Sequence, residues 1–184
     1  MTNTALVLVD IQNDYFEGGD WPVSKMNTVS ANAARLLENA RAKGDAIFHI
    51  RHEIPSDEAP FFRPGSQGAQ HHSSVAPQDG EPVILKHKAN SFQDTSLKQD
   101  LDAAGVTDVV ICGAMSQMCI DATTRAASDF GYNVTVVEDA CGAKETAFGD
   151  IEVPAEQVHA AFMAPLAMSY AKVVRAQDYL GGNG

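Results

Sequence analysis

Residues 108–132, DVVICGAMSQMCIDATTRAASDFGY, decide how the chain folds. The β-branched, apolar run at residues 109–112 predicts a short buried strand, and Gly113 ends that run. After a turn, the small and apolar residues between Met118 and Ala126 predict a helix. The stretch therefore predicts a strand followed directly by a helix packed against it.

Cys119 falls in the first turn of that helix. Unpaired backbone N–H groups and the positive end of the helix dipole favour ionisation of a thiol there, and the thiolate is the nucleophilic form. A small cysteine that packs the helix against a sheet is the alternative interpretation, because free cysteine is among the most buried residue types. This stretch alone leaves both interpretations open.

Strand and helix patterns alternate along the whole chain, and the strand candidates are continuous apolar runs rather than alternating ones. Such runs are typical of a parallel sheet covered by helices on both faces. We predict an α/β fold with three α/β/α layers, one domain over residues 1–184, and a mainly parallel, Rossmann-like sheet of six strands in the order 3-2-1-4-5-6. The expected strands are residues 5–9, 46–50, 82–85, 109–112, 133–137 and 172–174.

The composition restricts the possible partners. The 184 residues carry a net charge of −11, which argues against binding to nucleic acid or anionic membranes, and no apolar run reaches the length of a membrane span. The N-terminal residues lack the pattern of a secretion signal. Three cysteines without metal-ligand spacing suggest free thiols in a reducing compartment. We therefore expect a cytoplasmic protein that acts on a small molecule.

Two charged residues stand at the ends of other predicted strands. Asp10 follows the first strand and Lys86 follows the third, so both should reach the same carboxyl edge of the sheet as Cys119. Alternatively, Asp10 braces the next loop, and the stem of Lys86 runs along apolar surface to water. Together the three groups suit nucleophilic catalysis, because the carboxylate can move a proton and the ammonium can balance charge.

Several residues are weaker candidates for a substrate pocket. The loop after the first strand carries Tyr15, Phe16 and Trp21, which could line a pocket or form a local hydrophobic cluster. Phe61 lies in the long irregular segment 51–78 and could close the pocket or contact another subunit. Two polar residues in the turn before Cys119 could contact substrate, although the serine could instead cap the helix. These two are Ser116 and Gln117.

The sequence predicts no metal and no cofactor. The histidines near the second strand match no standard ligand spacing. No glycine-rich phosphate-binding fingerprint follows the first strand, so a nucleotide cofactor is not expected. The candidate histidines are His49, His52, His71 and His72.

Three motifs show a resemblance that covers nearly the full chain: LVLVDIQNDYF, VILKHKANSF and ICGAMSQMCIDATTRAASDFGYNVTVVEDAC. In their order and spacing they resemble the isochorismatase-like cysteine hydrolases. The resemblance implies Asp10 as general acid/base, Lys86 as the triad lysine and Cys119 as nucleophile. It also implies a cis peptide bond between Ala114 and Met115, with the N–H groups of Met115 and Cys119 forming an oxyanion hole, and a homo-oligomer, either a dimer or a tetramer.

Differences between branches of this family narrow the chemistry. The chain lacks the Asp-x-His metal motif that follows the second strand in nicotinamidases, and we expect no carrier-protein domain. FFRPGSQGAQ and SQMCIDAT are similar to streptothricin-hydrolase-like and orphan members. We therefore predict hydrolysis of an amide, carbamoyl or lactam C–N bond through a Cys119 thioester. The alternatives are an isochorismatase-type ether hydrolase, a small-molecule-binding protein with little turnover, and, disfavoured by the absence of a CxxC motif, a thiol redox protein.

Overall fold

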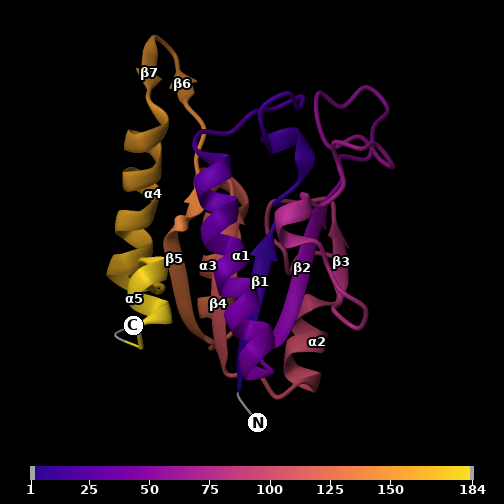
Figure 1. Ribbon diagram of the computed structural model, residues 1–184. Helices are drawn as coiled ribbons and strands as arrows, with labels where there is room; N and C mark the ends of the chain where they lie inside the picture. Colours follow the sequence, from indigo (N-terminus) through magenta and orange to yellow (C-terminus); the bar gives the residue numbers. More distant parts are fainter. Residues whose placement is uncertain (1–2, 183–184) are drawn as a thin grey trace.

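A computed structural model describes residues 3–182, so the four terminal residues of the predicted domain lie outside the described part. Its main sheet has six strands, all paired in parallel, in the order β3-β2-β1-β4-β5-β8. This confirms the predicted fold class and strand order, with the sixth sheet strand labelled β8 (Figure 1). The strands are β1 (Thr4–Val9), β2 (Ala46–His52), β3 (Val83–Lys86), β4 (Asp108–Ala114), β5 (Asn133–Gly142) and β8 (Lys172–Val174).

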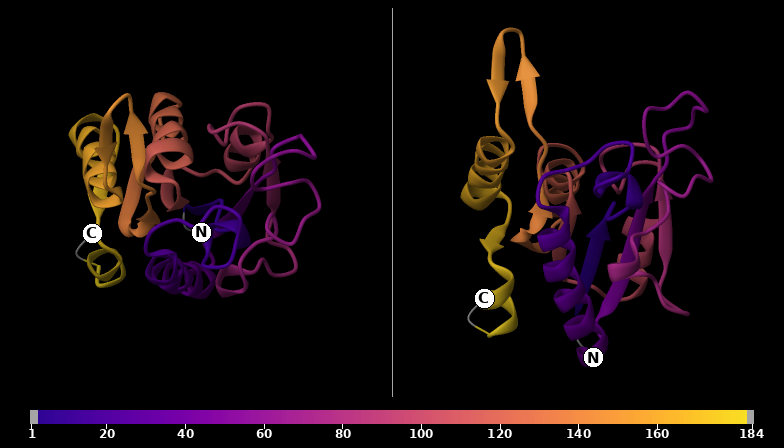
Figure 2. Two further views of the ribbon diagram at one scale, coloured as in Figure 1. Left: turned by 90° about the horizontal axis from the view of Figure 1, so that it is seen from above. Right: turned by 45° about the horizontal axis from the view of Figure 1, so that its top comes forward.

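Helices cover both faces of this sheet (Figure 2). One buried apolar cluster joins one face to α1 and α5, and a second joins the other face to α2, α3 and α4. Successive side chains of β1 alternate between the two clusters. Leu6 and Leu8 pack in the first, and Val7 and Val9 pack in the second. The helices are α1 (Met26–Lys43), α2 (Leu97–Ala103), α3 (Asp121–Asp129), α4 (Ala155–Ser169) and α5 (Ala176–Leu180).

Two elements were not predicted from the sequence. One is α5, and the other is the antiparallel hairpin of β6 (Thr146–Phe148) and β7 (Ile151–Val153), which projects beyond the sheet at the end where its strands finish (Figure 1). The hairpin carries no buried face, and its apolar residues Phe148 and Ile151 are exposed. Apolar periodicity detects buried faces, so it could not find these short strands. Within residues 3–182, no helix is both long and apolar enough to cross a membrane.

The connection between β4 and α3 also differs from the prediction. Residues Ser116–Ile120 form a π-helical turn before α3 begins, so Cys119 lies in that wider turn rather than in the first turn of an α-helix. Such turns are rare and occur often at functional sites.

Gly113 allows β4 to approach β1 at this point. Its φ angle is +130°, and it pairs with Val9 of β1. A Cβ atom at Gly113 would lie 1.9 Å from the carbonyl oxygen of Val9.

We expect Gly113→Ala to lower the free energy of unfolding by about 2–4 kcal/mol, because backbone strain and overpacking add together. Chemical denaturation would measure this. Gly105→Ala, also at positive φ but in open space, is the control, and equal losses in both variants would contradict the role of the close approach.

Candidate active site

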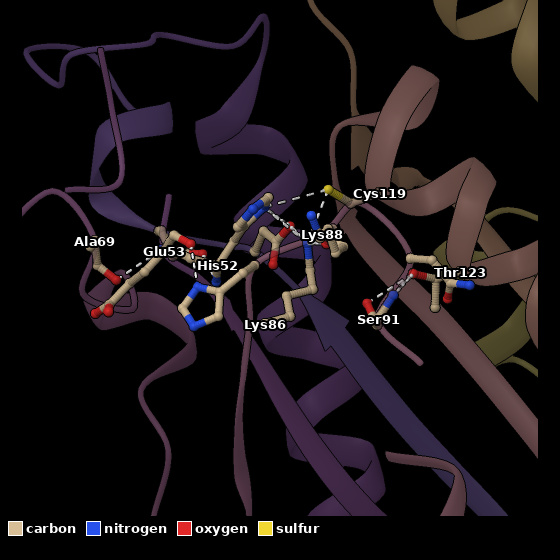
Figure 3. A network of polar contacts seen from close by, with 12 residues as sticks. His52, Glu53, Ala69, Lys86, Lys88, Ser91, Cys119 and Thr123 are labelled. Atoms are coloured by element: carbon tan, nitrogen blue, oxygen red, sulfur yellow. Dashed lines mark hydrogen bonds and ion pairs between the residues drawn. The ribbon is translucent and has the colours of Figure 1, made fainter. Parts of the chain in front are cut away.

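The three predicted residues meet at the carboxyl edge of the sheet, where Figure 3 labels Lys86 and Cys119. Asp10 directly follows β1, Lys86 is the last residue of β3, and Cys119 comes from the π-helical turn after β4. The Nζ atom of Lys86 lies 2.8 Å from Asp10 Oδ2 and 3.1 Å from Cys119 Sγ. A carboxylate, an ammonium and a thiol are therefore in direct contact in a nearly solvent-free site, because all three side chains are buried.

Lys86 is the centre of the site. Besides Asp10 and Cys119, its ammonium contacts His52 Nδ1 at 3.0 Å and the carbonyl oxygen of Lys88 at 3.0 Å. An ammonium has only N–H donors, so each of the four partners can act only as an acceptor or a negative charge. The lysine thus bridges β1, β2 and the Cys119 turn, and the alternative of a lysine that reaches solvent is wrong.

Burial and charge oppose each other at Asp10 and Lys86. Burial tends to raise the pKa of the Asp10 carboxyl, but Lys86 and His52 outweigh it, so this pKa lies below its usual value. Burial likewise tends to lower the pKa of Lys86, and Asp10 and Cys119 reverse that change. The pair is therefore ionised, with one negative and one positive charge that compensate each other inside the protein.

The Cys119 thiol is less acidic than the sequence suggested. Burial raises its pKa above the usual value, the charge of Asp10 raises it further, and Lys86 only partly opposes this. This direction is opposite to the lowered pKa that the position of Cys119 in the sequence suggested, because burial and the charge of Asp10 outweigh the opposing effect of Lys86.

His52 is a site residue that the sequence analysis missed as a participant. Its Nδ1 atom lies 3.9 Å from Cys119 Sγ and 3.7 Å from Asp10 Oδ2. His52 pairs with Lys86 in the register of β2 and β3, so this register brings the ring to the site. Its position near the end of the second strand could have identified His52 in the sequence, because Asp10 was identified by its position at the end of the first strand.

Gln12 fixes the position of His52. The fully buried Gln12 amide accepts a hydrogen bond from the His52 N–H and donates one to the His52 carbonyl oxygen, both at 2.8 Å. It donates a second hydrogen bond to the carbonyl oxygen of Ala69. Gln12 therefore ties the loop after β1 to the end of β2 and to the long segment between β2 and β3.

Asp10, His52 and Cys119 form the one group of potential metal ligands among residues 3–182, with ligand atoms within 4.8 Å of one another. The Lys86 ammonium contacts an atom of each. A metal ion bound by these three atoms would therefore have to displace the ammonium, so these residues do not fit a metal while Lys86 occupies this position.

The aromatic pocket candidates pack against one another. Trp21 stacks on Phe61, with ring centroids 4.8 Å apart, and Tyr15 packs against Phe61 and Phe62. Phe16 stacks on the ring of His72 instead. The interpretation as a local hydrophobic cluster is therefore the one that the structure supports for most of this loop.

Tyr15 is a buried member of this cluster. Burial raises the pKa of its hydroxyl, and the neighbouring Cys119 and Asp10 groups raise it further. The Asp14 carboxylate, also buried, accepts hydrogen bonds from the N–H groups of Phe62 at 2.6 Å and Asp20 at 3.2 Å. Asp14 therefore holds the aromatic cluster over this edge of the sheet.

Ser116 and Gln117 have different environments. Ser116 is fully buried, and its hydroxyl lies within hydrogen-bond distance of the Gly142 carbonyl oxygen (3.1 Å) and of His159 Nδ1 (2.8 Å). It connects the turn to β5 and α4, and a contact of Ser116 with substrate stays a prediction. Gln117 donates a hydrogen bond to the carbonyl oxygen of Lys144 and stays a pocket candidate. The peptide bond between Ala114 and Met115 is cis.

Known proteins share this fold and sequence. The sequence profile of the Isochorismatase domain family matches residues 4–178. The isochorismatase family protein YddQ of Bacillus subtilis is 45% identical, and the match covers 96% of this chain and 98% of that protein. A solved structure from Oleispira antarctica, described as an isochorismatase hydrolase, is 50% identical with a TM-score of 0.95 and covers 97% of this chain and 96% of that one.

Two relatives are named for the bond that they hydrolyse or for their substrate. Maleamate amidohydrolase of Pseudomonas putida is 31% identical over 95% of this chain and 84% of that protein. Streptothricin hydrolase of Streptomyces noursei is 36% identical over 74% of this chain and 48% of that protein. The family resemblance noted in the sequence is thereby confirmed, and the chain belongs to the isochorismatase family of hydrolases.

Proposed function

We propose that the protein is a cysteine-dependent amidohydrolase that cleaves a C–N bond of a small molecule through a thioester on Cys119. The observation that carries the proposal is the contact of the Cys119 sulfur with the Lys86 ammonium, which itself holds the Asp10 carboxylate. Cys119 is thus a potential nucleophile with charged partners in a desolvated site, where charge–charge interactions are stronger than in water. The name of one relative, maleamate amidohydrolase, also supports hydrolysis of an amide bond.

In the proposed reaction, the thiol of Cys119 loses its proton and attacks the carbonyl carbon of the substrate. The C–N bond then breaks, the leaving nitrogen takes a proton, and the acyl group stays on sulfur. Water attacks the thioester, the carboxylic acid leaves, and a proton returns to sulfur. Lys86 keeps the sulfur's negative charge compensated during both halves, and the N–H groups of Met115 and Cys119 are the proposed donors to the oxyanion.

A panel of small primary amides, carbamoyl compounds, lactams and one vinyl ether tests the chemical class. We expect release of ammonia or amine from at least one C–N substrate, measured by enzyme-coupled ammonia detection and by mass spectrometry of the product. Cleavage of the vinyl ether alone would favour the ether hydrolase. Binding without turnover of any compound, seen as a raised melting temperature only, would favour a binding protein.

A further inference from the structure

Ser116 anchors the turn that carries Cys119. It is the first residue of the π-helical turn, and its carbonyl oxygen accepts a hydrogen bond from the N–H of Asp121, five residues later. Its side chain is fully buried. Ser116 therefore lies where a small displacement would move both the Cys119 sulfur and the N–H groups that are the proposed donors to the oxyanion.

Two partners hold the Ser116 hydroxyl. The carbonyl oxygen of Gly142 in β5 lies 3.1 Å from it, and Nδ1 of His159 in α4 lies 2.8 Å from it. A carbonyl oxygen can only accept, and the hydroxyl has a single O–H group to donate. Both contacts are hydrogen bonds when the hydroxyl donates to Gly142 and accepts from an N–H at Nδ1. The network thus assigns a proton to Nδ1 of His159.

Glu138 orients the ring of His159 from its other side. Oε2 of Glu138 in β5 lies 3.4 Å from Nε2 of His159, and Oε1 of the same carboxylate lies 3.2 Å from Nε of Arg175. These three side chains come from β5, from α4 and from the residue that follows β8. They connect the turn of the nucleophile to a part of the chain that supplies none of the three reactive groups.

The ring of His159 lies at the edge of the protein interior. Its side chain is 23% exposed, and with Glu138 and Arg175 it lines a cavity of about 290 Å³ between α1, β5 and α4. Water could meet the ring on this side, yet Nδ1 points inward to a fully buried hydroxyl. This direction favours a role in holding Ser116, and the open cavity means that a replacement of the ring costs little core packing.

We propose that His159, oriented by Glu138, is a positioning residue that fixes the turn of Cys119 through the Ser116 hydroxyl. The inference rests on the proposed cysteine hydrolase, and it assigns His159 no proton transfer and no contact with substrate. Without His159, the Ser116 hydroxyl keeps only its Gly142 partner of the two, so the turn is held less firmly. The sulfur and the oxyanion donors then lose their alignment with the substrate carbonyl, and a misplacement of about 1 Å can slow a reaction about 100-fold.

Two amide substitutions distinguish the two nitrogens of the ring. The side-chain N–H of asparagine lies close to the place of Nδ1, so His159→Asn can still donate to Ser116. Glutamine is longer and places its N–H close to the place of Nε2, so His159→Gln can reach Glu138 but not Ser116. The two variants carry the same functional group and differ in which contact survives.

Single-turnover acylation of Cys119 by 4-nitrophenyl acetate measures the effect, because each acylation releases one nitrophenolate. We expect His159→Gln to lower the limiting acylation rate at least about 10-fold, with the half-saturating ester concentration changed less than about threefold. His159→Asn should keep most of the wild-type rate. Leu166→Ala is the control for looser packing of α4: Leu166 is buried in the same helix, so its loss lowers stability but should not slow acylation.

A double-mutant cycle tests whether His159 acts through Ser116. Ser116→Ala should also slow acylation, and the double variant with His159→Gln should be no slower than the slower single variant, because both changes remove the same hydrogen bond. Circular dichroism and melting curves verify that each variant is folded. If Ser116→Ala does not fold, the contrast between His159→Asn and His159→Gln decides alone.

Equal acylation rates in His159→Gln and wild type, equal losses in His159→Gln and His159→Asn, or multiplied losses in the double variant would overturn the role of His159. Each of these results would leave Cys119 as the nucleophile. No nitrophenolate burst in wild type, or a burst of normal size in Cys119→Ala, would overturn the proposed function and, with it, the role of His159.

Discussion

Replacing Lys86 with methionine should lower the free energy of unfolding by about 3–5 kcal/mol, because the change leaves a charge buried without its partner. The Asp10 carboxylate is completely buried, and Lys86 is its nearest positive charge, at 2.8 Å. Methionine is close to lysine in shape, so packing changes little and the loss reports mainly the charge. Urea denaturation followed by circular dichroism would measure it.

The same substitution should remove nearly all turnover, since the sulfur would lose the positive charge of the Lys86 ammonium, 3.1 Å away. The double variant Asp10→Asn with Lys86→Met should regain most of the stability, because no unpaired charge remains, but none of the activity. Lys88→Met is the matched control: Lys88 is exposed and supplies only its backbone carbonyl to Lys86. A double variant no more stable than Lys86→Met would show that charge pairing is not what stabilises this site.

Replacing Cys119 with alanine should lower kcat/KM for any amide substrate by at least about 1,000-fold. The sulfur forms and breaks the bond to the acyl group in the proposed reaction, and removal of a nucleophile is among the largest single losses in enzymes. Stability should change much less than activity, because alanine fits the space and removes a group whose thiol form carries no charge.

Cys112→Ala is the matched control for that experiment. Cys112 is also buried, but it lies within β4 and contacts the α1 side of the sheet. Burial raises its pKa, and no ion pair or side-chain hydrogen bond joins Cys112 to a charged group among residues 3–182. We expect Cys112→Ala to lose some stability and to keep full turnover. Equal activity of Cys119→Ala and wild type would rule out the nucleophile.

The sequence predicted the parts of the site that stand at strand ends. Asp10 and Lys86 could be found because each lies at the end of a buried apolar run, and parallel strands bring such ends to one edge. Asp121 and Arg125, one helical turn apart in α3, form an ion pair at 2.9 Å, as this spacing favours. These features depend on local pattern and on topology, and both can be read from one sequence.

The missed features depend on contacts between distant segments. His52 reaches the site because it pairs with Lys86 in the register of β2 and β3. Gln12 belongs to the site because its side chain is hydrogen-bonded to the backbone of His52, 40 residues away. The raised pKa of Cys119 is a consequence of burial, which the position of a residue at a helix start does not reveal. Likewise, the hydroxyl of Ser116 lies within hydrogen-bond distance of His159 in α4, a residue 43 positions later in the sequence.

The most direct measurement is the mass of the protein during turnover. An acylating substrate, quenched in acid within the first turnover, should give a species heavier by the acyl group, and peptide mapping should place the addition on Cys119. The adduct should be absent in Cys119→Ala and present in Cys112→Ala. Product formation with no acyl group on Cys119, or with the group on another residue, would contradict the account.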